Sequence, residues 1–128
     1  MDGKELLVFE PGAVLFHQGD PGDYMLLILE GRLDVEVATP GDVGNAEKVT
    51  VVATLGPQDL LGELALFLPD SRRTATIRAK TQVVVQKMTY GRFQHSMAQL
   101  HERDPVLHDS ILAIARKLAD TTQRFAAK

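Results

Sequence analysis

The chain has 128 residues, 14 of them Lys or Arg and 17 Asp or Glu, which gives a net charge of −3. A hydrophobic fraction of 45% and a charged fraction of 24% are typical of one soluble globular domain and exclude a disordered chain and a collagen, while the acidic balance argues against binding of nucleic acid by this segment. There is no cysteine to form a disulfide or a thiolate metal site, and without a signal-peptide pattern or a long apolar run we expect a cytoplasmic protein that does not insert into membranes.

The first two-thirds of the chain is predicted to form short strands separated by turns. The cluster Gly19-Asp20-Pro21-Gly22-Asp23 is a strong turn signal, because glycine and proline adopt the backbone angles that turns require. The continuous apolar run at 24–29 predicts a strand buried on both faces, whereas 33–37 alternates and predicts one solvated face. Further strands are predicted at 6–9, 13–17, 49–55, 74–79 and 82–88. This spacing indicates an antiparallel barrel or sandwich.

The last third of the chain changes to a helical period. A first helix is predicted at 90–100, and Asp104-Pro105 then indicates an N-cap followed by proline at the first position of a second helix. Apolar residues of this helix recur at steps of four and three, at Leu107, Ile111, Ile114, Leu118, Thr121 and Phe125. Such a seam predicts packing on the barrel and on a second copy of the chain, as a homodimer; the alternative is that both faces are buried within one domain.

The segment 61–76 carries the features of an anion site. Gly62 opens a short apolar helix, and a helix N-terminus offers unpaired N–H groups and a partial positive charge. The paired arginines Arg72 and Arg73 follow it, and an arginine adds a planar cationic fork that suits two phosphate oxygens. We therefore expect a phosphate to bind here.

Three further residues of this segment refine the expected ligand. Thr74 and Ala75 are small enough to leave room beside the arginine, and the Thr74 hydroxyl can donate a hydrogen bond. A carboxylate at Glu63 would repel a phosphate, so its presence implies a neighbouring donor such as a sugar hydroxyl. A phosphate and a ribose hydroxyl together describe a nucleotide.

The sequence resembles the cyclic nucleotide-binding domain family, which includes the sensor domains of the cAMP receptor protein and of protein kinase A regulatory subunits. The motifs are Gly19-Asp20-Pro21-Gly22-Asp23, Ile28-Leu29-Glu30-Gly31, Gly62-Glu63-Leu64-Ala65-Leu66 and Arg73-Thr74-Ala75-Thr76. The resemblance implies one domain over 1–128 that is mainly β with flanking helices. It would be a double-stranded β-helix, a jelly-roll-like eight-stranded β-roll at about 5–89, with a short phosphate-cassette helix and a C-terminal helix pair at about 90–126.

The same resemblance implies the ligand and its contacts. The implied ligand-binding residues are Gly62, Glu63, Leu64, Ala65, Arg73, Thr74, Ala75, Thr121 and Thr122. Arg73 would bind the cyclic phosphate and Glu63 the ribose 2′-hydroxyl, while Arg72 fits less well as a direct ligand and is interpreted as solvated. Thr121 would meet the adenine of its own subunit and Thr122 that of the partner, although two threonines at a helix seam are equally consistent with packing alone. These residues favour cAMP, whereas Thr74 resembles the threonine that holds guanine in cGMP-dependent kinases, so cGMP is the competitor.

The expected function is regulatory, with no catalytic residue, no metal and no cofactor. Ligand binding would move the C-terminal helix and so control an attached or partner effector, of unknown kind. One alternative is a sensor of another small effector with the same fold. A cupin-like metal enzyme is less favoured, because the histidines at 17, 95, 101 and 108 show no spacing that would place two of them on one metal, and each is interpreted as a surface or capping residue.

Overall fold

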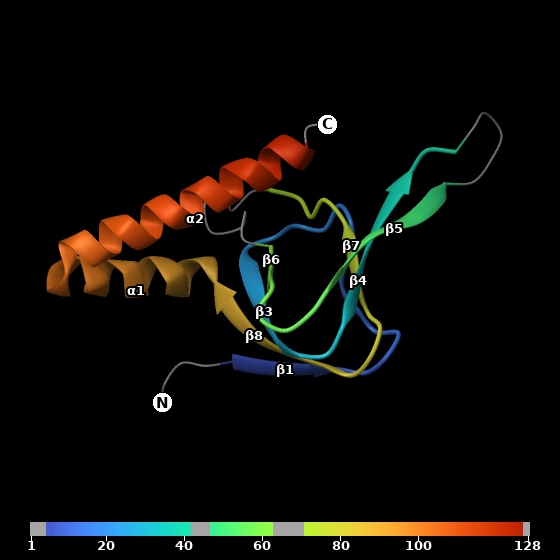
Figure 1. Ribbon diagram of the computed structural model, residues 1–128, viewed down its shortest axis with the longest axis horizontal. Coiled ribbons are helices and arrows are strands. Elements are labelled where there is room, and N and C mark those ends of the chain that lie inside the picture. Colours follow the sequence, from blue (N-terminus) through green and yellow to red (C-terminus); the bar gives the residue numbers. More distant parts are fainter. Residues whose placement is uncertain (1–4, 42–46, 63–70, 127–128) are drawn as a thin grey trace.

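The computed structural model describes residues 5–41, 47–62 and 71–126, with side chains as far as residue 117 (Figure 1). Within these ranges the strands are β1 (Glu5–Phe9), β2 (Val14–Phe16), β3 (Tyr24–Glu30), β4 (Leu33–Thr39), β5 (Lys48–Leu55), β6 (Leu60–Leu61), β7 (Thr76–Ala79) and β8 (Val83–Thr89). Two helices follow, α1 (Tyr90–Arg103) and α2 (Pro105–Ala126).

The strands form two four-stranded antiparallel sheets. One has the order β1-β8-β3-β6 and the other β2-β7-β4-β5, so most neighbours in space are distant in sequence. The first strand pairs with the last, for example Leu7 opposite Val85, and this pairing closes the roll. The prediction of a mainly β roll followed by a helix pair is confirmed, whereas the predicted cassette helix falls on 63–70 and lies outside the described residues.

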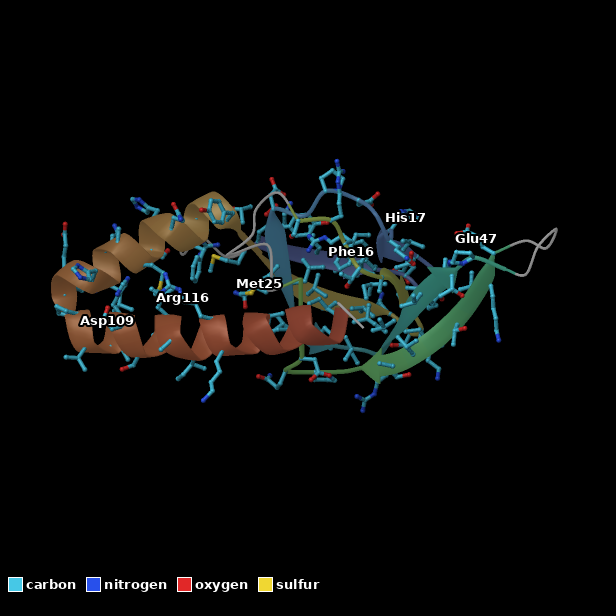
Figure 2. The ribbon with its side chains drawn as sticks, turned by 90° about the horizontal axis from the view of Figure 1, so that it is seen from above. Phe16, His17, Met25, Glu47, Asp109 and Arg116 are labelled. Carbon is cyan, nitrogen blue, oxygen red and sulfur yellow. The ribbon has the colours of Figure 1, made fainter. Side chains whose placement is uncertain are left out.

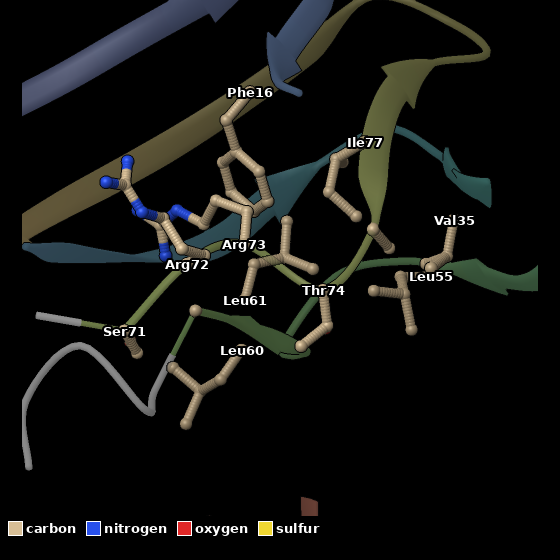
Figure 3. A pocket seen from close by; sticks show the side chains of 12 residues that line it. Phe16, Val35, Leu55, Leu60, Leu61, Ser71, Arg72, Arg73, Thr74 and Ile77 are labelled. Atoms are coloured by element: carbon tan, nitrogen blue, oxygen red, sulfur yellow. The ribbon is translucent and has the colours of Figure 1, made fainter. Parts of the chain in front are cut away.

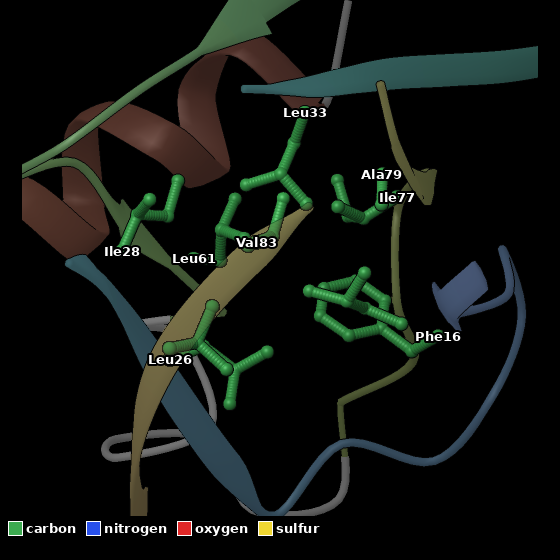
Figure 4. Close-up of a cluster of buried hydrophobic side chains, with 10 residues drawn as sticks. Phe16, Leu26, Ile28, Leu33, Leu61, Ile77, Ala79 and Val83 are labelled. Atoms are coloured by element: carbon green, nitrogen blue, oxygen red, sulfur yellow. The ribbon is translucent and has the colours of Figure 1, made fainter. Parts of the chain in front are cut away.

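The apolar core lies between the two sheets (Figure 4). Its most completely buried side chains come from inward-facing positions of β3, β4 and β8, namely Leu26, Ile28, Leu33, Val83 and Val85. The prediction that β3 is buried on both faces was wrong, because the outward side chains Met25 and Leu27 remain partly exposed. The run is continuously apolar, yet alternate side chains point to opposite faces and one face alone meets the core.

The segment around β6 and β7 departs from the sequence-based expectation. The two-residue strand β6 was not predicted, and β7 begins at Thr76 rather than at Thr74. The residues before β7 pair instead with the turn after β2: the Arg73 amide donates to the Asp20 carbonyl at 2.8 Å, and the Gly19 amide donates to the Arg73 carbonyl at 2.8 Å. This pairing ties the turn to the segment that the sequence singled out.

The two helices form an antiparallel hairpin beside and over the roll. The Thr89 hydroxyl caps α1 by accepting from the Arg92 amide, and the Asp104 carboxylate caps α2 by accepting from the Leu107 amide at 3.0 Å. The predicted start of the second helix at Asp104-Pro105 is therefore confirmed. Figures 1 and 2 show α2 running back along α1, with its C-terminal half over the roll. Among the described residues, no helix has the length and apolar character to cross a membrane.

Substituting Asp104 tests the cap that starts α2. Asp104→Ala removes the acceptor for the Leu107 amide and is expected to lower the free energy of unfolding by about 1 kcal/mol, whereas Asp104→Asn keeps a capping oxygen and should be nearly neutral. Urea denaturation measures both changes. Equal losses in the two variants would mean that the charge of Asp104 matters and its capping oxygen does not.

Candidate functional site

A cavity of about 170 Å³ opens between β6, the segment 71–75 and the inner face of the β2-β7-β4-β5 sheet (Figure 3). Its apolar wall consists of Phe16, Val35, Leu55, Leu60, Leu61 and Ile77. Gly62 and residues 71–75 form the remaining, more polar edge. The cavity thus offers an apolar surface for a flat ring beside a short polar and cationic segment.

The Arg73 side chain is buried at the polar edge of this cavity. The residue is only 7% exposed, although arginine is rarely buried in proteins. Its guanidinium carbon lies 4.1 Å from the centre of the Phe16 ring and 4.5 Å from that of the Tyr24 ring. Its Nη2 donates a hydrogen bond to the Tyr24 carbonyl at 2.8 Å. Two aromatic rings and one carbonyl therefore hold the guanidinium in place.

The positive charge of Arg73 is incompletely compensated within the described part of the chain. Its Nε is buried and has no hydrogen-bond partner there, and no described carboxylate forms an ion pair with it. Burial of a charge without a counter-charge or a full set of hydrogen bonds costs free energy. An anion that reached Nε would remove this penalty, so the arrangement favours an anionic ligand.

Two glycines leave the space that the Arg73 guanidinium fills. A Cβ on Gly22 would lie 2.8 Å from both Cζ and Nε of Arg73, and a Cβ on Gly62 would overlap its Nη1. Gly62 also has a φ of +74°, which side chains with a Cβ rarely adopt. The two rings therefore cover the faces of the guanidinium, and the bare backbone of Gly22 and Gly62 passes close to it.

The turn at 19–22 fixes the backbone from which Arg73 extends. Beyond the two hydrogen bonds between Arg73 and the turn, the Gly22 amide donates to the Ser71 carbonyl at 3.1 Å, and Pro21 and Arg72 form a β-bridge. This strand-like pairing continues beyond the sheet. Successive side chains of an extended segment point to opposite sides, so Arg72 and Arg73 point in opposite directions. Arg73 consequently points inward, while Arg72 is exposed, as predicted.

The structure brings four of the residues predicted to bind ligand to one cavity. Gly62, Arg73, Thr74 and Ala75 all line it, with Thr74 exposed and Ala75 buried. The predicted residues Glu63, Leu64 and Ala65 lie outside the described residues. Thr121 and Thr122 belong to α2, but their side chains are also outside the described part. The roles assigned to all nine residues remain predictions.

Sequence reasoning missed the residues that position Arg73. Phe16 and Tyr24 were seen only as parts of strands, and Gly22 only as part of a turn. The turn motif was a signal that this region is constrained, but nothing in its spacing relates it to a position some fifty residues later. That relation arises from the pairing of 19–22 with 71–73.

The prediction that no two histidines are placed to share one metal was wrong for His101 and His108, whose ligand atoms lie close together. The His101 and His108 rings have centroids 4.8 Å apart and planes at 82° to each other. The other two agree with the prediction of surface residues, since His95 is exposed on α1 and His17 is exposed near the Asp20 carboxylate. The pair at 101 and 108 lies at the turn between the helices, away from the cavity.

Comparison with known proteins gives consistent matches over most of the chain. The family model described as "Cyclic nucleotide-binding domain" matches residues 6–99. The cAMP-dependent protein kinase regulatory subunit of Dictyostelium discoideum is 43% identical over 77 residues, which is 59% of this chain and 22% of that protein. The chain spans a quarter or less of the length of the curated relatives it matches.

Solved structures show the same fold. The N-terminal domain of a transcriptional regulator from Streptomyces coelicolor A3(2) matches with a TM-score of 0.72 and 32% identity, over 95% of this chain and 79% of that one. The regulatory subunit of a cAMP-independent protein kinase A from Trypanosoma brucei matches with a TM-score of 0.67 and 28% identity, over 99% of this chain and 42% of that one.

Comparison of Gly62→Ala with Gly12→Ala distinguishes two effects on stability: crowding of the Arg73 side chain and strain in the backbone. Both glycines have positive φ, +74° and +89°, so each substitution should cost about 1–2 kcal/mol of unfolding free energy through the backbone. A Cβ at Gly12 meets nothing within 4 Å, whereas one at Gly62 displaces the guanidinium from its rings. Urea denaturation should therefore show a further loss of about 1 kcal/mol for Gly62→Ala. Equal losses of unfolding free energy in the two variants would contradict the inference that a Cβ at Gly62 crowds Arg73.

Proposed function

The chain belongs to the cyclic nucleotide-binding domain family, and from this premise we propose that it is a cAMP sensor whose ligand repositions α2. Its general role as a cyclic nucleotide-binding regulatory domain follows from the family match over residues 6–99. The observation that carries the more specific proposal is Arg73, a buried guanidinium whose Nε has no partner among the described residues. A cyclic phosphate is a compact anion whose oxygens could accept a hydrogen bond from this Nε.

We assign the phosphate of the ligand to the polar edge of the cavity. Arg73 Nε would donate to one phosphate oxygen while Nη2 keeps its hydrogen bond to the Tyr24 carbonyl. The Thr74 hydroxyl lies on the same edge and would supply a second donor, and Ala75 leaves the space beside it open. The ligand charge would neutralise the buried cation. Binding would then remove the free-energy cost of the uncompensated charge, and this gain would contribute to affinity.

The ribose and the base are assigned from the family resemblance. Gly62 and Leu64 would offer backbone contacts, Ala65 would complete the cassette, and Glu63 would accept from the ribose 2′-hydroxyl. The apolar wall of the cavity supports the placement of a flat ring next to them. Thr121 would then reach the adenine amino group.

Transmission of the signal would depend on α2. The C-terminal half of this helix lies over the roll in both views of the ribbon (Figures 1 and 2). A helix in this position can close over a bound base, with Thr122 serving the partner subunit in a homodimer. Ligand binding shifts the helix only if the two helix positions bind the nucleotide with different affinity. The moving helix would control an attached or partner effector, and the domain itself would have no catalytic role.

Binding of cGMP is the second candidate. It is favoured by Thr74, which is exposed at the edge of the cavity directly after the arginine that would hold the phosphate. A guanine amino group placed at that edge could donate to the hydroxyl. Another small anionic effector is a third candidate, since the matched regulatory subunit from Trypanosoma brucei, 28% identical to this chain, belongs to a protein kinase A described as cAMP-independent.

Calorimetry on adjacent arginine variants tests the assignment of the phosphate. Arg73→Ala removes a buried charge-assisted contact and should weaken cAMP by about 3 kcal/mol, roughly a hundredfold in Kd. Arg72→Ala is the matched control: this residue also lines the polar edge of the cavity, but it is exposed and interpreted as solvated, so its loss should change Kd less than about fivefold. A larger loss in Arg72→Ala would contradict the assignment, and absence of binding of both cAMP and cGMP to the wild type at millimolar concentration would overturn the proposal.

Two threonine variants test the choice of base. Thr121→Ala removes the proposed adenine contact and should weaken cAMP about fivefold while leaving cGMP nearly unchanged. Thr74→Ala should weaken cGMP more than cAMP, because the same hydroxyl would hold the guanine amino group. Competition between the two nucleotides at each variant measures both ratios. Equal losses of cAMP and cGMP in Thr121→Ala would remove the adenine assignment.

A further inference from the structure

Three potential metal ligands meet where α1 turns back into α2. The ligand atoms of His101, His108 and Asp109 all lie within 4.8 Å of one another. His101 belongs to the last turn of α1, whereas His108 and Asp109 belong to the first two turns of α2. Figure 2 shows Asp109 at the end of the helix pair that is remote from the roll. This cluster is separate from the cavity that contains Arg73.

We propose that His101, His108 and Asp109 bind a divalent transition-metal ion of the Zn²⁺ type across the α1–α2 turn. Two imidazoles and one carboxylate form a donor set that zinc uses when three protein ligands leave a fourth position for water. Imidazole suits Zn²⁺, Cu²⁺ and Ni²⁺, whereas Mg²⁺ and Ca²⁺ prefer oxygen ligands. The donor set therefore selects the class of metal.

The break between the helices creates the cluster. On one continuous helix, residues seven apart would be separated by about 10.5 Å along the axis, too far for a shared ion. Asp104 and Pro105 end α1 and start α2 as an antiparallel partner, which brings His108 back against His101. The prediction that no two histidines could share a metal failed because sequence spacing does not include the fold-back at this turn.

The observed separations require only a small adjustment for metal binding. Zinc–ligand bonds are about 2.1 Å, so ligand atoms around a tetrahedral zinc are roughly 3.4 Å apart. The cluster spans 4.8 Å at most and would contract by roughly 1.4 Å. His101 and Asp109 are exposed and therefore free to make this movement by rotation of their side chains, whereas His108 is more buried and provides a fixed point.

Charge around the turn also favours a cation. Asp109 Oδ1 lies 2.9 Å from His108 Nδ1, and a carboxylate bonded to one imidazole nitrogen orients the ring and strengthens the other nitrogen as a ligand. Between residues 101 and 109 the chain carries Glu102, Asp104 and Asp109 against Arg103. As the third ligand, Asp109 would give up this hydrogen bond and bring its negative charge directly to the ion.

Metal binding would fix the angle of the helix hairpin. An ion held by His101 from α1 and by His108 from α2 ties the two helices together at their turn. The inference does not rest on nucleotide binding, because it uses residues outside the cavity. If α2 moves on ligand binding as proposed, the ion would hold the N-terminal end of α2 in place while the rest of the helix rotates about it.

Titration of the untagged chain with Zn²⁺ tests the proposal. Calorimetry should show one saturable site, and His101→Gln and His108→Gln should each weaken it at least roughly tenfold, with Asp109→Asn causing a loss of about tenfold or more. His95→Gln is the matched control, because it removes an exposed α1 histidine outside the cluster and should leave the affinity unchanged. Zn²⁺ should raise the melting temperature of the wild type and of His95→Gln only.

Melting curves in chelator identify any variant that loses zinc binding only because it is unfolded. Each of these exposed or half-buried positions should tolerate substitution, so the variants should melt with one transition close to that of the wild type. Absence of a saturable Zn²⁺ site in the wild type, or an equal loss of affinity in His95→Gln, would overturn the proposal. Neither result depends on whether cAMP binds.

Discussion

The arginine at position 73 is a buried cation held between two aromatic rings, and the arrangement of the site follows from what this burial requires. Phe16 and Tyr24 stack on the guanidinium, and the Tyr24 carbonyl accepts one of its hydrogen bonds. Gly22 and Gly62 must lack side chains so that its edges fit. The buried Nε still has no hydrogen-bond partner within the described part of the chain, and an anionic ligand would supply one.

The strands could be predicted because their signals are local. Alternation at 33–37 and the turn at 19–23 reflect the pleat of a strand and the backbone angles of glycine and proline, which act over a few residues. The cap at Asp104 is local in the same way, since its carboxylate binds an amide three residues ahead. A strand of two residues such as β6 carries no such pattern and depends on pairing with β3.

The site could be predicted in part. The residues 73–75 were identified, but the burial of Arg73 depends on Phe16 from β2 and Tyr24 from β3, which meet it only after the roll has closed. The histidine pair at 101 and 108 was missed for the same physical reason. The turn between the two helices brings these residues together, and their spacing along one helix would not. Long-range packing therefore decides which of the polar residues act together.

We propose that the buried Nε–H of Arg73, which has no partner among the described residues, donates to the phosphate of a cyclic nucleotide. The most direct test of this proposal is the arginine Nε–H resonance in ¹⁵N-correlated NMR spectra, assigned by comparison with Arg73→Lys, during titration with cAMP and separately with adenosine. We expect a large downfield proton shift with cAMP and little change with adenosine, which offers the base and ribose without the phosphate. Saturation with cAMP while this resonance stays in place would contradict it.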